Sequence, residues 1–398
     1  MPTKKVVLAY SGGLDTTYCA LYLSRDLGLE VHAVMVDTGG FTADYCKEVE
    51  ARARSLGVTQ FKRIDAIQNY YEKCLKYLVY GNVLRNNTYP LSVSAERIFQ
   101  AIAVVEYANE IGADAVAHGS TGAGNDQVRF DLAFQILGQD MEIITPIRDG
   151  RLSRQEEIEY LKKNGLDLSW EKAKYSINAG LWGTSVGGAE TLTSDQPLPS
   201  TAYPTQASDT VPKTISLDFL QGELVGVDGK QYEHPVQAIQ ALAEQAKPYA
   251  IGRDIHVGDT IIGIKGRVGF EAAAPLLIIK AHHLLEKHVL TKWQQYWKEQ
   301  LANWYGMLLH EGQYLDPSMR NIETFLTDTQ KRVTGRVFVL LQTYNFQLQG
   351  IESTYDLMNA KFGQYGEMNL GWTGEDVRGF TKIMANQNQI YHSLTEQS

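Results

Sequence analysis

Short apolar runs alternate with segments of helical spacing over the first part of the chain. The apolar runs are Val6–Tyr10, Val31–Val36, Val58–Ile64, Ala113–His118 and Met141–Ile144, and the helical patterns are Asp15–Leu27, Ala43–Leu56, Ile67–Tyr80 and Ser94–Ile111. Strands separated by helices favour right-handed crossovers and an α/β domain with a doubly wound parallel sheet. Ligands bind such sheets beyond the carboxyl ends of the strands. The loops after Tyr10, Val36 and His118 are therefore the candidate binding loops.

The second half of the chain has the pattern of a mixed α+β domain. Strands are predicted at Thr214–Phe219, Leu224–Val227, Thr260–Lys265 and Leu276–Ile279, and helices at Pro235–Gln245 and His283–Gly306. The segment Gly183–Thr214 is rich in Ser, Thr, Gly and Pro, and a long loop of this kind is often functional. We divide the chain into an α/β domain at residues 1–168, an α+β domain at 169–360 and a helical tail at 361–398.

The tail is predicted to form an amphipathic helix over Thr373–His392. Its apolar face carries Val377, Phe380, Ile383 and Met384, and Thr373 with Asp376 is close to a capping box. Such a helix docks on another subunit or packs on its own chain, and the sequence does not separate the two.

Composition and charge indicate which classes of molecule the protein is expected to bind. The 398 residues carry a formal net charge of −9, whereas proteins that bind nucleic acid usually have a basic excess. No apolar run approaches the ~20 residues that span a bilayer, and the strand near the N-terminus is too short for a signal-peptide core. Cys19, Cys46 and Cys74 lack metal-ligand spacing and are predicted to be buried thiols. We expect a cytoplasmic enzyme with small-molecule substrates.

The loop Ser11-Gly12-Gly13-Leu14-Asp15-Thr16 joins the first strand to the first helix. Its glycines allow a ligand to approach the backbone, and the N–H groups, hydroxyls and positive helix end attract anionic oxygens. It is not a Walker loop, because the Gly-Lys-Ser/Thr ending is absent. Asp15 would repel phosphate unless a Mg²⁺ ion lies between them. The loop resembles that of the N-type ATP pyrophosphatases, which activate a substrate oxygen by adenylation.

A second motif narrows the resemblance to one family. Residues 117–130 match the argininosuccinate synthase signature Ala-His-Gly-x-Thr-Gly-x-Gly-Asn-Asp-Gln-x-Arg-Phe. The resemblance implies ATP contacts at Ala9, Tyr10, Ser11, Gly12, Gly13, Leu14, Asp15, Thr16, Thr17, Val36 and Gly119. It assigns aspartate to Thr121, Asn125 and Asp126, and citrulline to Tyr89, Ser94, Asn125, Arg129, Ser176 and Ser185. It further implies ATP with Mg²⁺ as cofactor, catalytic roles for Asp15, Asp126 and Arg129, and a homotetramer.

The chemistry that the resemblance implies needs no side-chain nucleophile. The ureido oxygen of citrulline attacks the α-phosphorus of ATP, pyrophosphate leaves, and the amine of aspartate then displaces AMP. Two rivals stay open: another adenylating ligase or thiolase of the superfamily, and a non-enzymatic ATP-binding regulator. Outside these motifs, Glu156, Glu157 and Glu159 are interpreted as a solvated helix face.

One stretch departs from the family pattern. In the register set by Gly252-Arg253 and residues 262–267, Gly258 stands where the family has a Glu of the citrulline site, and Phe270 where it has a Tyr. Two hypotheses follow. Either Asp259 replaces the missing carboxylate, or the substrate is an Nα-acylated citrulline that carries no ammonium group.

Overall fold

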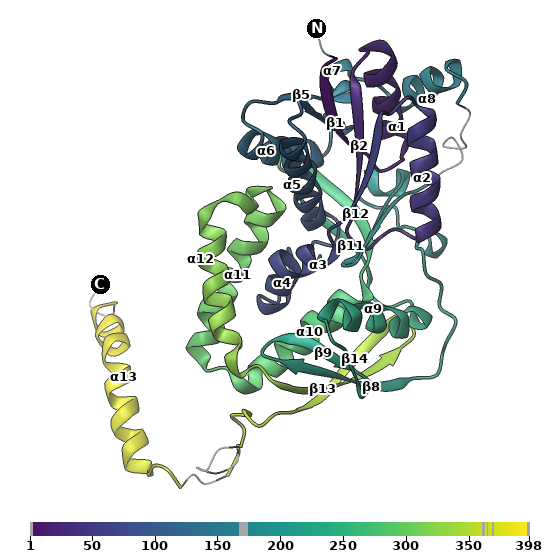
Figure 1. Ribbon diagram of the computed structural model, residues 1–398. Helices are drawn as coiled ribbons and strands as arrows, with labels where there is room; N and C mark the ends of the chain where they lie inside the picture. The colour runs from purple at the N-terminus through teal and green to yellow at the C-terminus, as the bar shows by residue number, and fades with distance from the viewer. Residues whose placement is uncertain (1–2, 167–173, 360–362, 364, 368–369, 396–398) are drawn as a thin grey trace. The chain divides into compact units, whose positions relative to one another are not determined.

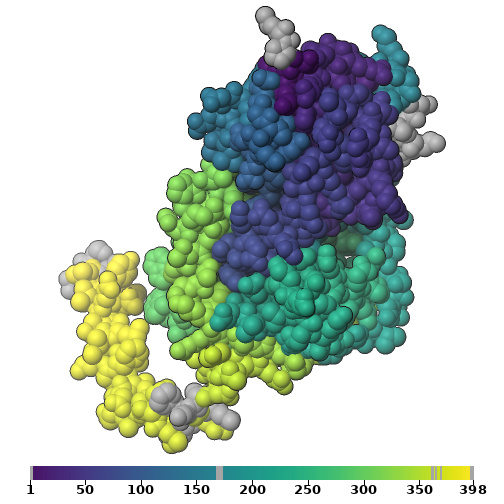
Figure 2. All heavy atoms as spheres, viewed as in Figure 1, coloured from purple at the N-terminus to yellow at the C-terminus, as the bar shows by residue number. Residues whose placement is uncertain are grey.

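A computed structural model describes residues 3–166, 174–359, 363, 365–367 and 370–395 (Figure 1). The chain forms two compact units, Met1–Thr354 and Tyr355–Ser398. Within the first unit, the N-terminal and central parts of the chain form one continuous body (Figure 2). The predicted domain boundaries at 168/169 and 360/361 fall in stretches outside the described residues. None of the described helices is long and apolar enough to cross a membrane.

The predicted parallel sheet is confirmed, with strand order β3-β2-β1-β4-β5. Its strands are β1 (Lys5–Ala9), β2 (Glu30–Asp37), β3 (Gln60–Asp65), β4 (Ala115–Ala117) and β5 (Glu142–Ile144). β1 is the central strand and lies between β2 and β4. The chain passes from β1 through β2 to β3 on one side, and then continues with β4 and β5 on the other side. This reversal places a ligand-binding crevice at the carboxyl end of β1.

Helices cover both faces of this sheet, as Figure 1 shows. On one face lie α1 (Leu14–Leu21, continued by a π-turn at Tyr22–Asp26), α2 (Ala43–Ser55), α7 (Pro146–Gly150) and α8 (Arg154–Lys163). The other face packs against α5 (Ser94–Glu110) and α6 (Asp126–Leu137). Val6 and Leu8 of β1 face the first group and Val7 the second, which is the period of two of a strand buried on both sides.

Two antiparallel sheets complete the first unit, ordered β10-β9-β8-β13-β14 and β11-β12-β7-β6. The strands are β6 (Ser176–Gly180), β7 (Gly183–Gly187), β8 (Lys213–Leu220), β9 (Glu223–Val227), β10 (Lys230–Gln231), β11 (Arg253–Asp259), β12 (Lys265–Glu271), β13 (Gly335–Gln342) and β14 (Asn345–Glu352). The helices are α3 (Ile67–Tyr70), α4 (Lys76–Tyr80), α9 (Pro235–Ala246), α10 (Ala273–Val289), α11 (Lys292–His310) and α12 (Pro317–Thr329). A π-turn at Tyr71–Leu75 joins α3 to α4.

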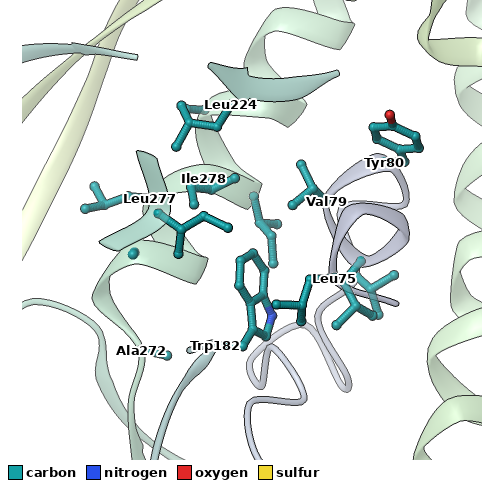
Figure 3. Close-up of a cluster of buried hydrophobic side chains, with 14 of the residues drawn as sticks. Leu75, Val79, Tyr80, Trp182, Leu224, Ala272, Leu277 and Ile278 are labelled. Carbon is teal, nitrogen blue, oxygen red and sulfur yellow. The ribbon is translucent and has the colours of Figure 1, made fainter. Parts of the chain in front are cut away.

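The largest core joins the two halves of this unit. Trp182 is fully buried among Leu75, Val79, Leu277 and Ile278, and its indole N–H donates to the Pro90 carbonyl at 3.0 Å (Figure 3). The bond satisfies the polar atom of a large buried aromatic side chain. Since the core includes residues of both halves, it fixes the hairpin β6–β7 against the start of α5, where the functional site lies.

Three predicted elements are wrong. Leu276–Ile279 lies within α10, because an apolar run buried on all sides has no period that separates strand from helix. Residues 260–264 form the turn between β11 and β12 rather than a strand, with Gly263 at φ +86°. The predicted helix His283–Gly306 is two helices, because Thr291 and Gln294 form a capping box that starts α11.

The second unit contains the predicted terminal helix, α13 (Gly374–Thr395). The Thr373 backbone N–H donates to the Asp376 carboxylate at 2.8 Å, and the Asp376 N–H donates to the Thr373 hydroxyl at 3.3 Å. The predicted capping interaction is confirmed. The three cysteines of the first unit are buried and not disulfide-bonded, as predicted.

Candidate active site

A cavity of about 860 Å³ lies at the carboxyl ends of β1, β2 and β4. Residues from α5, from the loops after β1, β2 and β4, and from β6 line it. All the residues predicted to bind ATP line it except Gly12 and Thr17. Thr121, Asp126 and Ser176, predicted for aspartate and citrulline, line it as well. Its volume is in the range that accommodates a nucleotide-sized ligand.

The loop after β1 is shaped for a ligand by Gly12. This residue has φ +76°, and a Cβ there would stand 2.7 Å from a methyl group of Val49 on α2, so only glycine fits. The Tyr45 hydroxyl donates to the Ser11 carbonyl at 3.1 Å, and the Arg52 guanidinium donates to the Gly12 carbonyl. Because the Ser11 and Gly12 carbonyl groups are bonded to side chains of α2, the N-terminus of α1 faces the cavity.

The loop after β4 is fixed by His118. Its Nδ1 accepts from the Ser120 backbone N–H at 3.1 Å, so the ring proton is on Nε2, which donates to Asp131 at 2.9 Å. The Asp131 carboxylate also accepts from Arg148 at 2.6 Å. This chain of bonds orients the turn that carries Gly119 and Thr121 into the cavity.

The carboxyl group of Asp15, in the first turn of α1, is influenced by a second carboxyl group, that of Glu157 in α8. The interpretation of Glu157 as part of a solvated face is wrong: it is 2% exposed, while Glu156 and Glu159 are exposed. Glu157 lies one turn before Leu161 and therefore on the buried face of α8. Burial and the neighbouring Asp15 raise the pKa of Glu157 to about 8, and burial also raises the pKa of Asp15.

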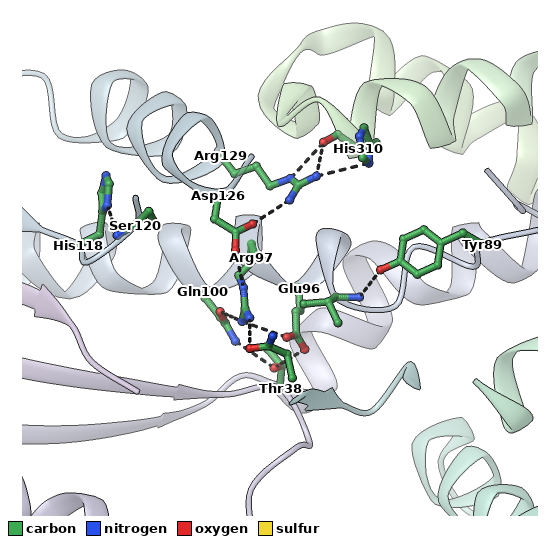
Figure 4. Close-up of polar contacts among 12 residues, drawn as sticks. Thr38, Tyr89, Glu96, Arg97, Gln100, His118, Ser120, Asp126, Arg129 and His310 are labelled. Carbon is green, nitrogen blue, oxygen red and sulfur yellow. Dashed lines mark hydrogen bonds and ion pairs between the residues drawn. The ribbon is translucent and has the colours of Figure 1, made fainter. Parts of the chain in front are cut away.

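Asp126 is held between two arginines at the start of α6 (Figure 4). The Arg97 Nε donates to it at 3.2 Å and the Arg129 Nη1 at 2.8 Å. Burial alone would raise the pKa of Asp126, but the two guanidinium charges outweigh it, and the pKa is lowered. Asp126 is therefore an anion at neutral pH, with a side chain still 40% exposed toward the cavity.

Several polar residues of this site were not predicted from the sequence. Glu96 accepts from the Thr38 hydroxyl at 2.9 Å and from Arg97 at 3.1 Å, and Arg97 also donates to Gln100 and to Asn178 of β6. Burial raises the pKa of Glu96 to about 7. The sequence did contain a signal for this pair. Glu96 and Arg97 lie in the first turn of α5, among apolar residues whose helical spacing predicts that this part of the helix is buried. A charged pair on a buried face is a candidate functional pair.

Comparison with known proteins decides the family. Residues 5–167 match the profile "Arginosuccinate synthase N-terminal HUP domain" and residues 175–391 match "Arginosuccinate synthase C-terminal domain". The argininosuccinate synthase of Methanocaldococcus jannaschii is 36% identical over 388 residues, 97% of each chain. That of Dictyoglomus thermophilum is 36% identical over 394 residues, 98% of each chain. The chain belongs to the argininosuccinate synthase family.

Argininosuccinate synthase signature residues lie on both sides of Asp126. Arg129, predicted to reach citrulline, also donates through Nε and Nη2 to the His310 carbonyl at 3.1 and 2.8 Å. Asn125 accepts from the Ile261 backbone N–H at 2.9 Å, which ties the turn between β11 and β12 to the start of α6. Neither residue lines the cavity directly.

The remaining residues predicted for citrulline gather around Tyr89. The Tyr89 ring stacks on His256 with centroids 5.0 Å apart and packs against Phe270 at 5.3 Å. Ser185 of β7 lies opposite Phe270 of β12 in the sheet register. Ser94, at the first position of α5, has a buried hydroxyl with no hydrogen-bond partner among the residues described.

The departure from the family pattern also lies beside Tyr89. A Cβ at Gly258 would stand 2.7 Å from Nε2 of His256, so the His256 ring takes the space in which a side chain at 258 would start. Burial and the nearby Arg85 lower the pKa of His256 to about 4, which keeps its ring neutral. The Asp259 carboxylate is 70% exposed and pairs with Lys265. In this conformation it does not replace the missing carboxylate.

Proposed function

We propose that this protein is an argininosuccinate synthase that joins citrulline to aspartate with cleavage of ATP to AMP and pyrophosphate. The main support for this proposal is that the phosphate-type loop after β1 and the signature residues after β4 line the same cavity. Membership of the family along nearly the whole chain supports it.

ATP lies along the carboxyl end of the parallel sheet in this proposal. Val36 of β2 is placed against the adenine, and the N–H groups at the start of α1 hold the phosphates. The carboxylate of Asp15 is the type of ligand that Mg²⁺ prefers beside phosphate oxygens. A Mg²⁺ ion held by Asp15 would supply positive charge beside the leaving pyrophosphate. The residues of the loop after β1 hold the phosphate groups in one orientation during the reaction.

Both chemical steps then depend on positioning rather than on a side-chain nucleophile. The citrulline ureido oxygen attacks the α-phosphorus, which breaks the bond to pyrophosphate and forms citrullyl-adenylate. The aspartate amine attacks the ureido carbon, loses a proton and displaces AMP, which leaves with the ureido oxygen. Holding the three reactants in line removes much of the entropic barrier. The Arg97–Asp126–Arg129 group supplies fixed charge where the aspartate binds.

The proposal is tested by exchange of labelled pyrophosphate into ATP. We expect exchange to require citrulline but not aspartate, and addition of aspartate to give AMP and argininosuccinate in equal amounts. Formation of ADP, or exchange that needs a different acceptor, would show another ligase of the superfamily. Binding of ATP without any cleavage would show the non-enzymatic regulator instead.

Asp126 is proposed to hold the ammonium group of aspartate, with Thr121 and Asn125 at its carboxylates. Replacing Asp126 by alanine removes one charge-assisted hydrogen bond, worth about 1.5–3 kcal/mol. Because the Asp126 side chain is partly exposed, we expect the lower end, an increase of about tenfold in the KM for aspartate. The KM for ATP should change less than about twofold. Equal increases in both KM values would contradict the assignment.

The assembly, the compartment and the division of the chain are also proposals. Family resemblance favours a homotetramer, which light scattering by the purified full chain will check. It also favours a cytoplasmic enzyme, in keeping with the buried, unpaired cysteines. We also propose nucleotide-binding, synthetase and tail domains at 1–168, 169–360 and 361–398. The first boundary is supported by the family match, in which one profile ends at residue 167 and the next begins at residue 175.

A further inference from the structure

We propose that Glu96 is a positioning residue for the aspartate site, and that its charge makes this site prefer a substrate with an ammonium group. The inference rests on the proposed function, since it concerns the second substrate of that reaction. Glu96 lies outside both sequence motifs. It acts through Arg97 on Asp126 rather than by contact with the substrate.

The first observation is the chain of contacts that joins Glu96 to Asp126 (Figure 4). Oε1 of Glu96 accepts from Nη1 of Arg97 at 3.1 Å, and Nε of Arg97 donates to Oδ2 of Asp126 at 3.2 Å. Oδ1 of Asp126 accepts from Nη1 of Arg129 at 2.8 Å. Both oxygens of Asp126 are thus held by guanidinium groups, and the orientation of this carboxylate depends on where Glu96 holds Arg97.

Glu96 is itself held by two other parts of the fold. Its Oε2 accepts from the hydroxyl of Thr38, in the loop after β2, at 2.9 Å. A Cβ at Gly180 would collide with the same oxygen, so the backbone of β6 lies directly against the carboxylate. The Glu96 side chain is buried at the wall of the cavity. A buried carboxylate needs a cation to offset the loss of hydration, and Arg97 supplies that charge.

The second observation is the charge balance of this cluster. Two carboxylates, those of Glu96 and Asp126, face two guanidinium groups, those of Arg97 and Arg129. With Glu96 ionised the four charges cancel, and the exposed part of Asp126 can attract an ammonium group. With Glu96 neutral the cluster has one surplus positive charge, which repels an ammonium group and attracts carboxylates. The charge of Glu96 therefore determines how strongly the site prefers an amino acid to the matching dicarboxylic acid without the amine.

Ionisable groups from the neighbouring elements, among the residues described, leave this balance unchanged. Asp37 of β2 is paired with Arg63 of β3, and burial raises the pKa of Tyr70 on α3 well above its usual range, so its ring is neutral. Burial would raise the pKa of Asp126, but the two arginines lower it, and Asp126 stays ionised. Burial raises the pKa of Glu96 to about 7. Of these groups, Glu96 is the one that changes charge near neutral pH.

The test compares aspartate with succinate, which has the same two carboxylates and lacks the amine. With the full-length chain, the KM for aspartate and the inhibition constant of succinate as its competitor together give the preference for the ammonium group. We expect Glu96→Gln, which keeps the shape of the side chain and can still accept from Arg97, to lower this preference about tenfold. Because Glu96 does not touch the reacting atoms, kcat should change less than about threefold.

Glu106→Gln is the matched control, because Glu106 is an exposed carboxylate on the same helix, α5. It should leave the preference for aspartate over succinate unchanged. An unchanged preference in Glu96→Gln, whether both ligands bind as before or both bind more weakly, would overturn the inference and show that Glu96 only supports the fold.

The pH dependence of the unaltered chain is a second measurement, which does not require the variant to fold. Glu96 takes up a proton as the pH falls from about 8 to about 6.5, so the preference for aspartate should fall about threefold over this range. In Glu96→Gln the same profile should be flat. A flat profile in the unaltered chain would overturn the inference while leaving the proposed function intact. Absence of turnover with citrulline and aspartate at every pH would instead remove the proposed function, and this inference with it.

Discussion

Replacing Asp15 by alanine is expected to lower kcat by two to three decades while the protein stays folded. Asp15 is in the first turn of α1, where its carboxylate faces the cavity beside the phosphate-type loop. In the proposed reaction, charge builds up on the leaving pyrophosphate at this point. Removing one preorganised electrostatic group from a reacting centre typically lowers turnover by about 10²–10³-fold. Steady-state turnover with saturating Mg²⁺, citrulline and aspartate measures the effect.

Asp44→Ala is the matched control for this prediction. Asp44 is also an acidic residue in the first turn of the helix that follows a parallel strand, but its side chain is 94% exposed and pairs with Lys47. Its loss should leave kcat unchanged within about twofold, as for other exposed ion pairs. Near-normal turnover in Asp15→Ala, with normal dependence on Mg²⁺, would show that the loop does not act through this carboxylate. Circular dichroism of both variants separates loss of activity from loss of fold.

The parallel sheet was predictable because each of its signals is local. A strand buried on both faces, such as the predicted Val6–Tyr10, is a compact apolar run that can be recognised in the sequence. A loop such as Ser11–Thr16 can be recognised from its residue types alone. The prediction at Leu276–Ile279 was wrong because its signal was not local. Leu276–Ile279 is apolar in every position, so its type depended on packing between elements far apart in the sequence.

The polar site was only partly predictable for the same reason. Asp126 and Arg129 lie in one motif and were found together, whereas Arg97, the second partner of Asp126, is 29 positions away along the chain. Glu157 was misinterpreted because three glutamates in four positions resemble an exposed face. Only the packing of α8 against α1 shows which of them points inward.

In the family register that we propose, Gly258 stands where a carboxylate would face citrulline, and two free energies decide whether Asp259 replaces it. An ammonium group left without a partner in a buried pocket costs about 3–5 kcal/mol. The pair between Asp259 and Lys265 lies at the surface, with both side chains 70% exposed, and exposed ion pairs of this kind contribute little to stability. Breaking this pair so that Asp259 turns toward the ligand is therefore favourable overall. The Asp259 carbonyl accepts from Arg85 at 3.3 Å, and the Arg85 charge also acts on the His256 ring that stacks on Tyr89.

We therefore expect Asp259→Asn to lower kcat/KM for citrulline by about 100-fold, because the substrate's ammonium group would then lack a partner. The KM values for ATP and aspartate should stay within about twofold, since neither ligand is proposed to touch Asp259. Lys265→Gln is the control: it removes the ion-pair partner but keeps the carboxylate, so citrulline should bind as well as before or slightly better.

The same assay, run with Nα-acetylcitrulline and Nα-succinylcitrulline, separates the two hypotheses about the substrate. If Asp259 receives the ammonium, the unaltered enzyme should prefer free citrulline by tenfold or more, and Asp259→Asn should reduce that preference. The neutral His256 and the nearby Arg85 offer an ammonium group no attraction, so without Asp259 the pocket would favour an uncharged α-nitrogen. A preference of the unaltered enzyme for either acylated substrate, insensitive to Asp259→Asn, would establish that the amine is capped and that Phe270 packs against the acyl group.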